Sequence, residues 1–251
     1  FCWPDPVQSE KTPDGEYKLA QLVRANQALY DYTKKFVVPC ISGKDSMKND
    51  STRGGRKISI PPSLLFSMIA KMDDVRKAVT PDCKTAGDLV YVIGLTKPEL
   101  GGSEYFAMLD ATGNNVPKVD ADMALRTFHA VSEATGRELV RSLTTPALGG
   151  LAVAFARCAM AGRLGMEIEL GKIPAEACSE LELLFSESNS RFVATVAPGD
   201  AAAFEALLAG VPFARVGVVT ETPELLLHGA APVSVSVEAL LREYKGTLDQ
   251  I

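Results

Sequence analysis

Apolar residues recur at the spacing of helical turns near the start of the chain. They run from Tyr17 to Phe36, and Lys34 and Lys35 lie at the end of the run. This spacing gathers the apolar side chains on one face of a helix, and positive charge suits the carboxyl end of the helix dipole. The pattern predicts one helix between these residues, after an irregular, proline-rich lead-in over 1–16.

Short apolar runs bounded by glycine and proline predict the strands. Uninterrupted runs are typical of strands buried on both faces, whereas alternation of apolar and charged residues is typical of a half-exposed strand. The predicted strands are 37–41, 63–70, 88–94, 166–170, 191–196, 213–219 and 224–227. Helical periodicity predicts further helices over 121–144, 150–161 and 200–208.

Two glycines interrupt a polar segment at 49–56, for which we expect a mobile loop. A boundary near Thr80-Pro81 separates the first part of the chain from a region in which strands and helices alternate. We therefore predict two domains, 1–80 and 81–251, the second with an α/β or α+β fold.

Length and composition are those of an ordinary globular protein. The chain has 251 residues, enough for one large or two smaller domains, of which 47% are hydrophobic and 23% charged. The formal charge is −5 and no basic run stands out, which argues against nucleic acid or an anionic membrane surface as a partner. No apolar run approaches the length of a membrane span, so we expect a cytoplasmic protein.

The five cysteines are widely spaced and form no Cys-x-x-Cys pair, so we expect reduced thiols rather than zinc or disulfides. The two histidines, His129 and His228, have no cysteine or carboxylate at ligand spacing. We expect both to be structural or exposed, and we expect Trp3 to be a packing anchor rather than a stacking platform. Because the sequence starts with Phe1, we expect a fragment of a longer protein.

A turn at 42–46 sets a lysine, an aspartate and a serine side by side. Gly43 permits close backbone approach, Lys44 supplies positive charge for a phosphate, and Asp45 offers a hard oxygen ligand for Mg²⁺. The Ser46 hydroxyl would donate to a phosphate oxygen, as phosphoryl transfer requires. The first glycine of a Walker A loop is missing. The alternative is an Asx-type turn in which the aspartate caps the following amides.

Five stretches in order along the chain resemble sequences of one enzyme family. They are Phe1-Cys2-Trp3-Pro4-Asp5-Pro6, 38–47 with the turn just described, Gly101-Gly102-Ser103-Glu104-Tyr105, Leu148-Gly149-Gly150-Leu151-Ala152 and Leu184-Phe185-Ser186-Glu187-Ser188-Asn189-Ser190-Arg191-Phe192. The chain thus resembles the phosphoribosylformylglycinamidine synthases, ATP-dependent amidotransferases of purine synthesis in the aminoimidazole ribonucleotide synthetase-like superfamily.

The resemblance implies the later of two related synthetase halves. Residues 1–80 would be the back part of a barrel-forming amino-terminal domain, and 81–251 a complete carboxy-terminal mixed-sheet α/β domain. The barrel domain would pair with that of the earlier half, and unpaired strand edges favour a homodimer of the fragment. A separate glutaminase domain or subunit would supply ammonia.

The resemblance also implies two groups of ligand contacts. ATP would contact Gly43, Lys44, Asp45 and Ser46, with Asp45 as the Mg²⁺ ligand. Substrate would contact Ser46, Glu187, Ser188 and Asn189. Some relatives carry Gly-Gly-Asn-Val-Ser at the first site, so that Lys44 would stand where an asparagine binds metal, which leaves Asp45 or no metal. At the second site, an ion pair between Glu187 and Arg191 across a turn is the alternative.

Two further stretches also have two interpretations. Glu104 would bind metal or an amine, or it would cap a helix while Tyr105 packs in the core, which we favour. Many relatives carry His-Asp-x-Ser-x-Gly-Gly where this chain reads Thr144-Thr145-Pro146-Ala147-Leu148-Gly149-Gly150. The ionisable residues are absent here, so we expect no acid–base chemistry, and the helix start is either a nucleotide cradle or a place of close packing.

By resemblance, the parent protein would convert formylglycinamide ribonucleotide, ATP and glutamine-derived ammonia into formylglycinamidine ribonucleotide, ADP and phosphate. A second interpretation is a non-catalytic scaffold half that binds a structural nucleotide and completes the active site of the other half. A third is another member of the superfamily, such as a selenophosphate synthetase or a thiamine-phosphate kinase.

Overall fold

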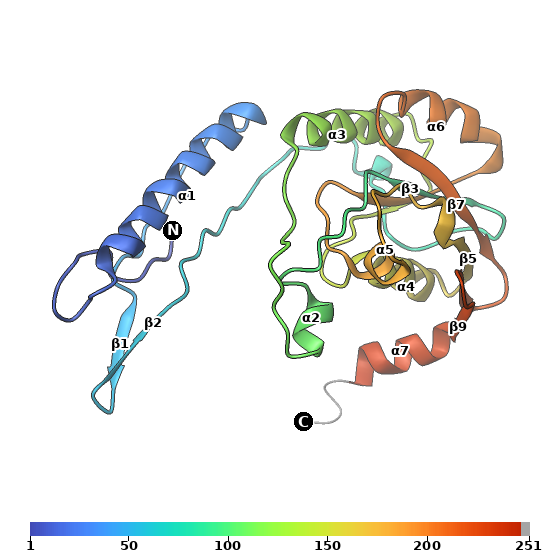
Figure 1. Cartoon of the computed structure of the whole chain (residues 1–251). Helices are drawn as coiled ribbons and strands as arrows, with labels where there is room; N and C mark the ends of the chain where they lie inside the picture. Colours follow the sequence, from blue (N-terminus) through green and yellow to red (C-terminus); the bar gives the residue numbers. More distant parts are fainter. Residues whose placement is uncertain (247–251) are drawn as a thin grey trace. The chain divides into compact units, whose positions relative to one another are not determined.

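The computed structural model describes residues 1–246. These residues form two compact units, one over Phe1–Asp73 and one from Asp74 onward, which Figure 1 shows in blue to cyan and in teal to red. The structure thus divides the chain a few residues before the boundary at 80 that the sequence suggests.

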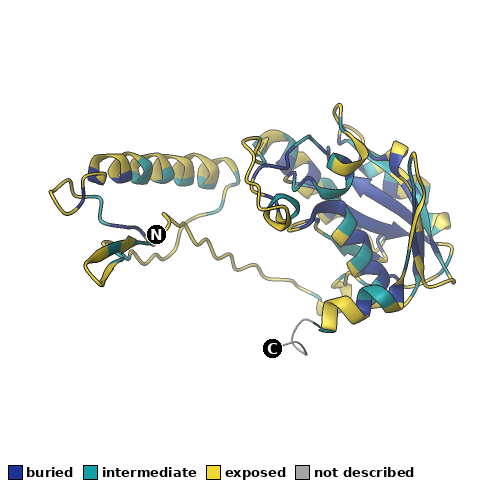
Figure 2. Cartoon of the chain, turned by 60° about the horizontal axis from the view of Figure 1, so that its bottom comes forward, coloured by how far each residue is buried: buried dark blue, intermediate teal, exposed yellow. Residues whose placement is uncertain are grey.

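The first unit contains one long helix. α1 spans Gly15–Lys35 and confirms the helix predicted from the apolar period. Trp3 is 4% exposed, and its indole N–H donates to the Lys18 carbonyl at 2.9 Å, so it anchors the lead-in to this helix as predicted. Within this unit α1 is mostly exposed along its length (Figure 2), and Leu19 and Val23 remain open to solvent.

A hairpin follows α1 in the first unit. β1 (Asp50–Arg53) and β2 (Arg56–Ser59) pair antiparallel, and both Gly54 and Gly55 between them have positive φ. Such a turn matches the twist of the two strands and favours glycine. The prediction of a mobile loop at 49–56 is therefore wrong, because its two glycines form the turn of a hairpin.

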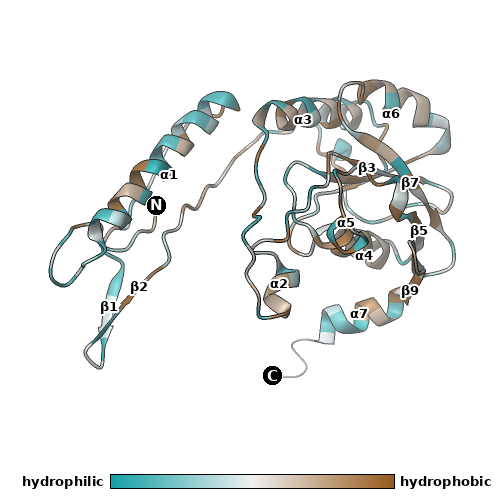
Figure 3. Ribbon diagram, viewed as in Figure 1, coloured by the Kyte–Doolittle hydropathy of each residue, from teal (hydrophilic) through white to brown (hydrophobic). Residues whose placement is uncertain are grey.

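Neither strand predicted at 37–41 or 63–70 forms. The first segment has no strand pairing within the described residues, and the second contributes one bridge, from Ser63 to Cys2. A strand needs a partner that completes its hydrogen-bond ladder. Both segments stay largely exposed (Figure 2) although they are apolar (Figure 3), and Ile69 is 93% exposed. Hydrophobicity predicted strands here, but residues 1–246 contain no partner strand for either segment.

A seven-stranded mixed sheet in the order β4-β6-β3-β7-β5-β8-β9 forms the second unit. The strands are β3 (Leu89–Ile93), β4 (Ser142–Thr144), β5 (Gly165–Glu169), β6 (Phe192–Val196), β7 (Phe213–Thr220), β8 (Glu224–His228) and β9 (Val233–Ser236). Paired strands run antiparallel except β5 and β8, which are parallel. The five strands predicted in this region all form, and the predicted mixed α and β class is confirmed.

Helices cover both faces of this sheet, as Figure 1 shows. α4, α5 and α7 cover one face, and α3 and α6 cover the other. Their bounds, with those of α2 and the short 3₁₀ helices, are α2 (Glu104–Met108), α3 (Ala121–Gly136), α4 (Gly150–Gly162), α5 (Glu180–Phe185), α6 (Ala201–Leu207), α7 (Val237–Gly246), η1 (Val75–Lys77), η2 (Leu170–Lys172) and η3 (Pro198–Asp200). The central strand β3 alternates between the faces: Val90 and Val92 lie in the core under α4, and Tyr91 lies in the core under α3 and α6.

The helix predicted over 121–144 is too long. α3 ends at Gly136, and Glu138 adopts a positive φ of 60° that no helix continues through. Ser142 then begins edge strand β4, which pairs with β6, and its hydroxyl lies 2.6 Å from the Thr195 hydroxyl. Pairing with a distant strand outweighs the local helical period at this point.

Two further observations concern the cysteines and the length of the helices. All five cysteines are free. None of the helices within residues 1–246 is both long and apolar enough to cross a membrane.

The buried carboxyl of Asp88, just before β3, is expected to make the stability of the second unit depend on pH. Its side chain is 2% exposed and burial raises the pKa of its carboxyl, which Arg141, 3.4 Å away through Nε, only partly offsets. The folded state therefore binds the proton more tightly than the unfolded state, so the contribution to stability is complete below the ordinary pKa of 3.8 and is lost as pH rises through the folded value. We expect Asp88→Asn to raise the thermal midpoint at about pH 7, and the gain to vanish near pH 3.

Thermal scans of both proteins between these pH values measure this effect. A gain of equal size at both ends of the range would contradict the assignment to the Asp88 carboxyl.

Candidate functional site

The predicted phosphate turn lies in the first unit, between α1 and β1. The Lys44 ammonium donates a hydrogen bond to the Ser46 hydroxyl, so the two polar groups stand together. The Ser46 backbone is held on both sides: its N–H donates to Phe1 at 2.8 Å, and its carbonyl accepts from Trp3 at 2.8 Å. Gly43 has open space around it, so a ligand meets no steric barrier there.

Asp45 is exposed in the same turn. Its carboxylate lies 3.6 Å from the amino group of Phe1, and in residues 1–246 it accepts no backbone N–H from the residues that follow. The Asx-type turn is therefore not formed. No group of three or more histidine, cysteine or acidic side chains is placed to hold a metal within the described part of the chain. Asp45 alone would therefore hold Mg²⁺, an ion that keeps several waters and shares phosphate ligands.

Glu187 connects three of the five family-like stretches. Its Oε1 accepts from the backbone N–H of Glu104 at 2.9 Å and from that of Gly149 at 2.9 Å. Glu104 is the first residue of α2, and Gly149 immediately precedes α4, where negative charge is stabilised by the helix dipole. The Glu187 carboxylate thus occupies the start of α4, for which a nucleotide cradle was one of the two interpretations.

Gly150 shows that close packing also shapes this helix start. Its φ is +66°, and an added Cβ would lie 2.6 Å from the Leu184 carbonyl oxygen and 2.7 Å from that of Ser186. Real Cβ atoms do not approach backbone oxygens so closely, so glycine is required. The geometry therefore supports the second of the two interpretations of this stretch.

Arg191 clamps the loop before β6 from inside the protein. It is 1% exposed, and its guanidinium donates to the carbonyls of Ser188 and Ser186 and to the Thr96 hydroxyl. Burial lowers the pKa of the guanidinium to about 10. These bonds replace the Glu187–Arg191 ion pair that was the alternative interpretation.

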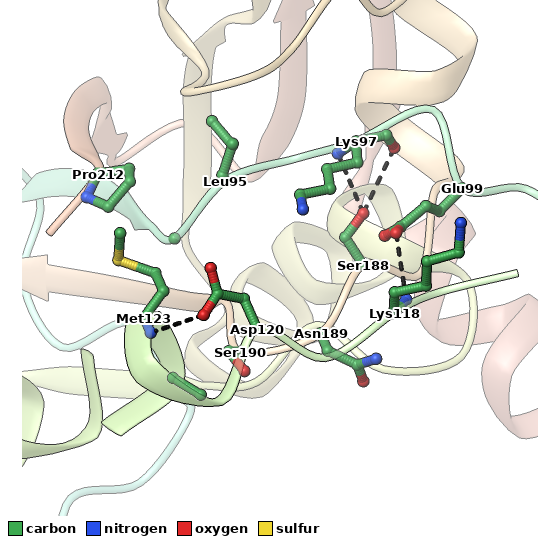
Figure 4. Close-up of a pocket in the computed structure, with 12 residues that line it drawn as sticks. Leu95, Lys97, Glu99, Lys118, Asp120, Met123, Ser188, Asn189, Ser190 and Pro212 are labelled. Carbon is green, nitrogen blue, oxygen red and sulfur yellow. Dashed lines mark hydrogen bonds between the residues drawn. The ribbon is translucent and has the colours of Figure 1, made fainter. Parts of the chain in front are cut away.

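Two predicted substrate residues, Ser188 and Asn189, line a pocket of about 90 Å³ in the second unit (Figure 4). Ser188 is 2% exposed, and its hydroxyl accepts from the Lys97 N–H at 3.1 Å. The other lining residues are Gly94, Leu95, Lys97, Glu99, Lys118, Asp120, Met123, Ala124, Ser190 and Pro212. They come from the end of β3, the start of α3 and the loops before β6 and β7.

Four charged residues of this pocket were missed by sequence reasoning. Lys97 and Glu99 follow β3, and Lys118 and Asp120 precede α3. Charged residues placed directly after a buried strand are the signal that would have pointed to the first pair. Asp120 is the N-cap of α3, and the Met123 N–H that its carboxylate accepts holds its pKa below the usual range.

The remaining candidate residues lie neither in the turn at 43–46 nor in the wall of the pocket. Ser103, not Glu104, caps α2, and Glu104 is the exposed first residue of that helix, so the predicted cap was placed one residue too late. Tyr105 is half-buried, and its ring stacks on Phe185 at 5.0 Å rather than packing in the core. His129 is exposed on α3 and His228 is half-buried at the end of β8. The structure thus leaves two separate places to consider, the turn at 43–46 and the pocket at 188–189.

Residues 85–228 match the domain family described as AIR synthase related protein, C-terminal domain. The phosphoribosylformylglycinamidine synthase subunit PurL of Alkaliphilus metalliredigens is 30% identical over 244 residues, which is 96% of this chain and 32% of that protein. The PurL subunit of Thermococcus gammatolerans is 36% identical over 186 residues, covering 74% of this chain and 25% of that protein. The chain therefore spans a third or less of the length of these curated relatives.

Solved structures show the same fold. PurL of T. maritima complexed with FGAR superposes with a TM-score of 0.65 at 18% identity, over 84% of this chain and 36% of that chain. The structure of PurLQS from Thermotoga maritima gives a TM-score of 0.57 at 20% identity, over 66% of this chain and 28% of that chain. The resemblance carried by the five stretches is confirmed. Because the domain match covers more than half of its residues, the chain belongs to the AIR synthase related proteins and contains their C-terminal domain.

Proposed function

We propose that this chain is part of the later half of a phosphoribosylformylglycinamidine synthase, an ATP-dependent carbon–nitrogen ligase. The similarity to PurL subunits along nearly the whole chain carries this proposal. The whole enzyme converts formylglycinamide ribonucleotide, ATP and ammonia into formylglycinamidine ribonucleotide, ADP and phosphate. It acts in the cytoplasm, together with the earlier half and a glutaminase domain or subunit that supplies ammonia.

The turn in the first unit is the proposed nucleotide site. The Lys44 ammonium neutralises a phosphate, the Ser46 hydroxyl beside it donates to a phosphate oxygen, and Gly43 leaves room for the ligand. Asp45 is the proposed Mg²⁺ ligand; a bound Mg²⁺ neutralises charge that develops on the phosphates. Glu187, Ser188 and Asn189 remain the proposed substrate contacts, the last two through the pocket in Figure 4.

A scaffold half that binds nucleotide without turning it over is the second candidate. The residues just before α4 carry no ionisable side chain, and the Gly149 N–H at the helix start already donates to the Glu187 carboxylate. This observation favours the scaffold for this part of the protein while the full enzyme remains a ligase.

Calorimetric titration of Mg·ATP into the chain tests the nucleotide site. We expect micromolar binding that Asp45→Ala weakens at least tenfold, because the metal loses its protein ligand. Asp73→Ala is the matched control, since Asp73 is an exposed aspartate that pairs with Lys71 two residues away.

Equal affinity in both variants would show that Asp45 takes no part in nucleotide binding. Phosphate release on adding formylglycinamide ribonucleotide and ammonium then separates the two candidates. Binding with release supports the ligase, and binding without release supports the scaffold.

A further inference from the structure

Glu99 carries an acceptor that the protein does not use. The residue is 3% exposed, and its Oε1 accepts from the Lys118 N–H at 3.1 Å. Its Oε2 is buried and has no hydrogen-bond partner in the described part of the chain. A buried carboxylate oxygen without a donor is costly, so a ligand that brings an N–H there is stabilised. Figure 4 shows this carboxylate beside Ser188 at the pocket.

The lysines of the same pocket supply donors. Lys97 lies with its Nζ 3.7 Å from Glu176, and the Lys118 ammonium has no partner among the described residues. Together with Asp120, the pocket has two basic and two acidic side chains. The two carboxylates would repel a simple anion, and the two lysines would repel a metal cation. Neither kind of ion therefore suits this pocket.

The size and the walls of the pocket narrow the ligand further. About 90 Å³ admits a group of a few heavy atoms, and Leu95, Met123 and Pro212 provide apolar walls. Removing a zwitterion from water into such a pocket costs more than removing a neutral polar group. The group that fits is neutral, with an N–H donor and an oxygen acceptor on neighbouring atoms.

We propose that this pocket binds a carboxamide, whose N–H donates to Glu99 Oε2 and whose carbonyl oxygen accepts from a lysine ammonium. Both bonds are charge-assisted and hence stronger than bonds between neutral groups. The inference deepens the proposed function, because each of the two secondary amides of the proposed substrate has one N–H and one carbonyl oxygen. It rests on the proposed function only for the identity of that substrate.

Acetamide and acetate are the probes, because they have the same shape and differ in an NH₂ replaced by a carboxylate oxygen. Titration of the full chain is followed by ¹H–¹⁵N chemical shifts of the Lys97, Lys118 and Ser188 amides. We expect saturable shifts with acetamide in the millimolar range and at least tenfold weaker binding of acetate, which the Glu99 carboxylate repels.

Glu99→Gln is expected to reverse this preference. The glutamine carbonyl keeps the bond from the Lys118 N–H, and its NH₂ then points where Oε2 was, so it donates to acetate and opposes acetamide. Lys118→Met retains that backbone bond and is expected to weaken acetamide without a reversal. Glu221→Gln, on an exposed loop between β7 and β8, is the control that leaves both affinities unchanged.

Shifts for neither probe, or equal affinity for both, overturn the proposal. If Glu99→Gln does not fold, the acetamide-to-acetate ratio in the native chain and in Lys118→Met still decides it. The readout is independent of Mg·ATP binding at Asp45, so failure here and failure of the proposed function are told apart.

Discussion

Replacing Arg191 with methionine is expected to destabilise the second unit by about 3–5 kcal/mol. The side chain is 1% exposed, and its guanidinium donates to two carbonyls and one hydroxyl, which lose this donor in the variant. Each buried acceptor left without a donor costs about 1–3 kcal/mol. The change also removes the positive charge with which buried Glu99 interacts electrostatically.

Chemical denaturation followed by circular dichroism measures this loss, and amide hydrogen exchange in β3 and β6 assigns it to the second unit. Arg242→Met is the matched control, because Arg242 is exposed on α7 and its ion pair with Glu243 lies at 3.5 Å in solvent. An exposed pair contributes less than about 1 kcal/mol. Equal losses in the two variants would mean that the Arg191 clamp adds nothing beyond a surface arginine.

Gly150→Ala is expected to have an effect of similar size, about 3 kcal/mol or more, for a steric reason. The backbone there has a φ of +66°, and the new methyl would press on the carbonyls of Leu184 and Ser186 at 2.6 and 2.7 Å. Relief would require α4 to move away from the loop that holds Glu187, so its bond to the Gly149 amide would lengthen as well.

Gly136→Ala is the control with the opposite sign. Gly136 is the last residue of α3, and an added Cβ there meets nothing within 4 Å. Alanine lowers the backbone entropy of the unfolded chain and favours the helix, so a gain of up to about 1 kcal/mol is expected. Thermal unfolding of both variants separates the effect of the methyl group itself from that of its surroundings. Similar midpoints for the two would contradict the steric account.

Arg191 and Gly150 lie in a small region where several loops that are distant in the sequence come together. Glu187 bonds to a residue 83 positions away and to another 38 positions away. Arg191 reaches Thr96, 95 positions away, and Ser188 reaches Lys97, 91 positions away. The loop at 186–191 is thus held on both sides, which places Ser188, Asn189 and Ser190 in the wall of the pocket.

Elements whose signal is local could be predicted from the order of the amino acids alone. The apolar period predicted α1, and uninterrupted or alternating runs predicted β3 and β5, because a helix face and a strand face each depend on neighbouring residues. The five family-like stretches were also readable in sequence, and they led to the correct family. Of the candidate site, they indicated the turn at 43–46 and residues 187–189.

Which segments acquire pairing partners depends on long-range contacts, and these are seen in the folded protein alone. The apolar runs at 37–41 and 63–70 have no strand beside them in the described residues, whereas Ser142–Thr144 pairs with β6 despite a helical pattern. Glu99 is a second case. Its carboxylate is buried with one oxygen unpaired because the loop after β3 packs against the loop before α3, and the sequence does not show this contact. The physical reason is that ladder bonds and buried polar contacts join residues far apart in the chain, where no local pattern records the partner.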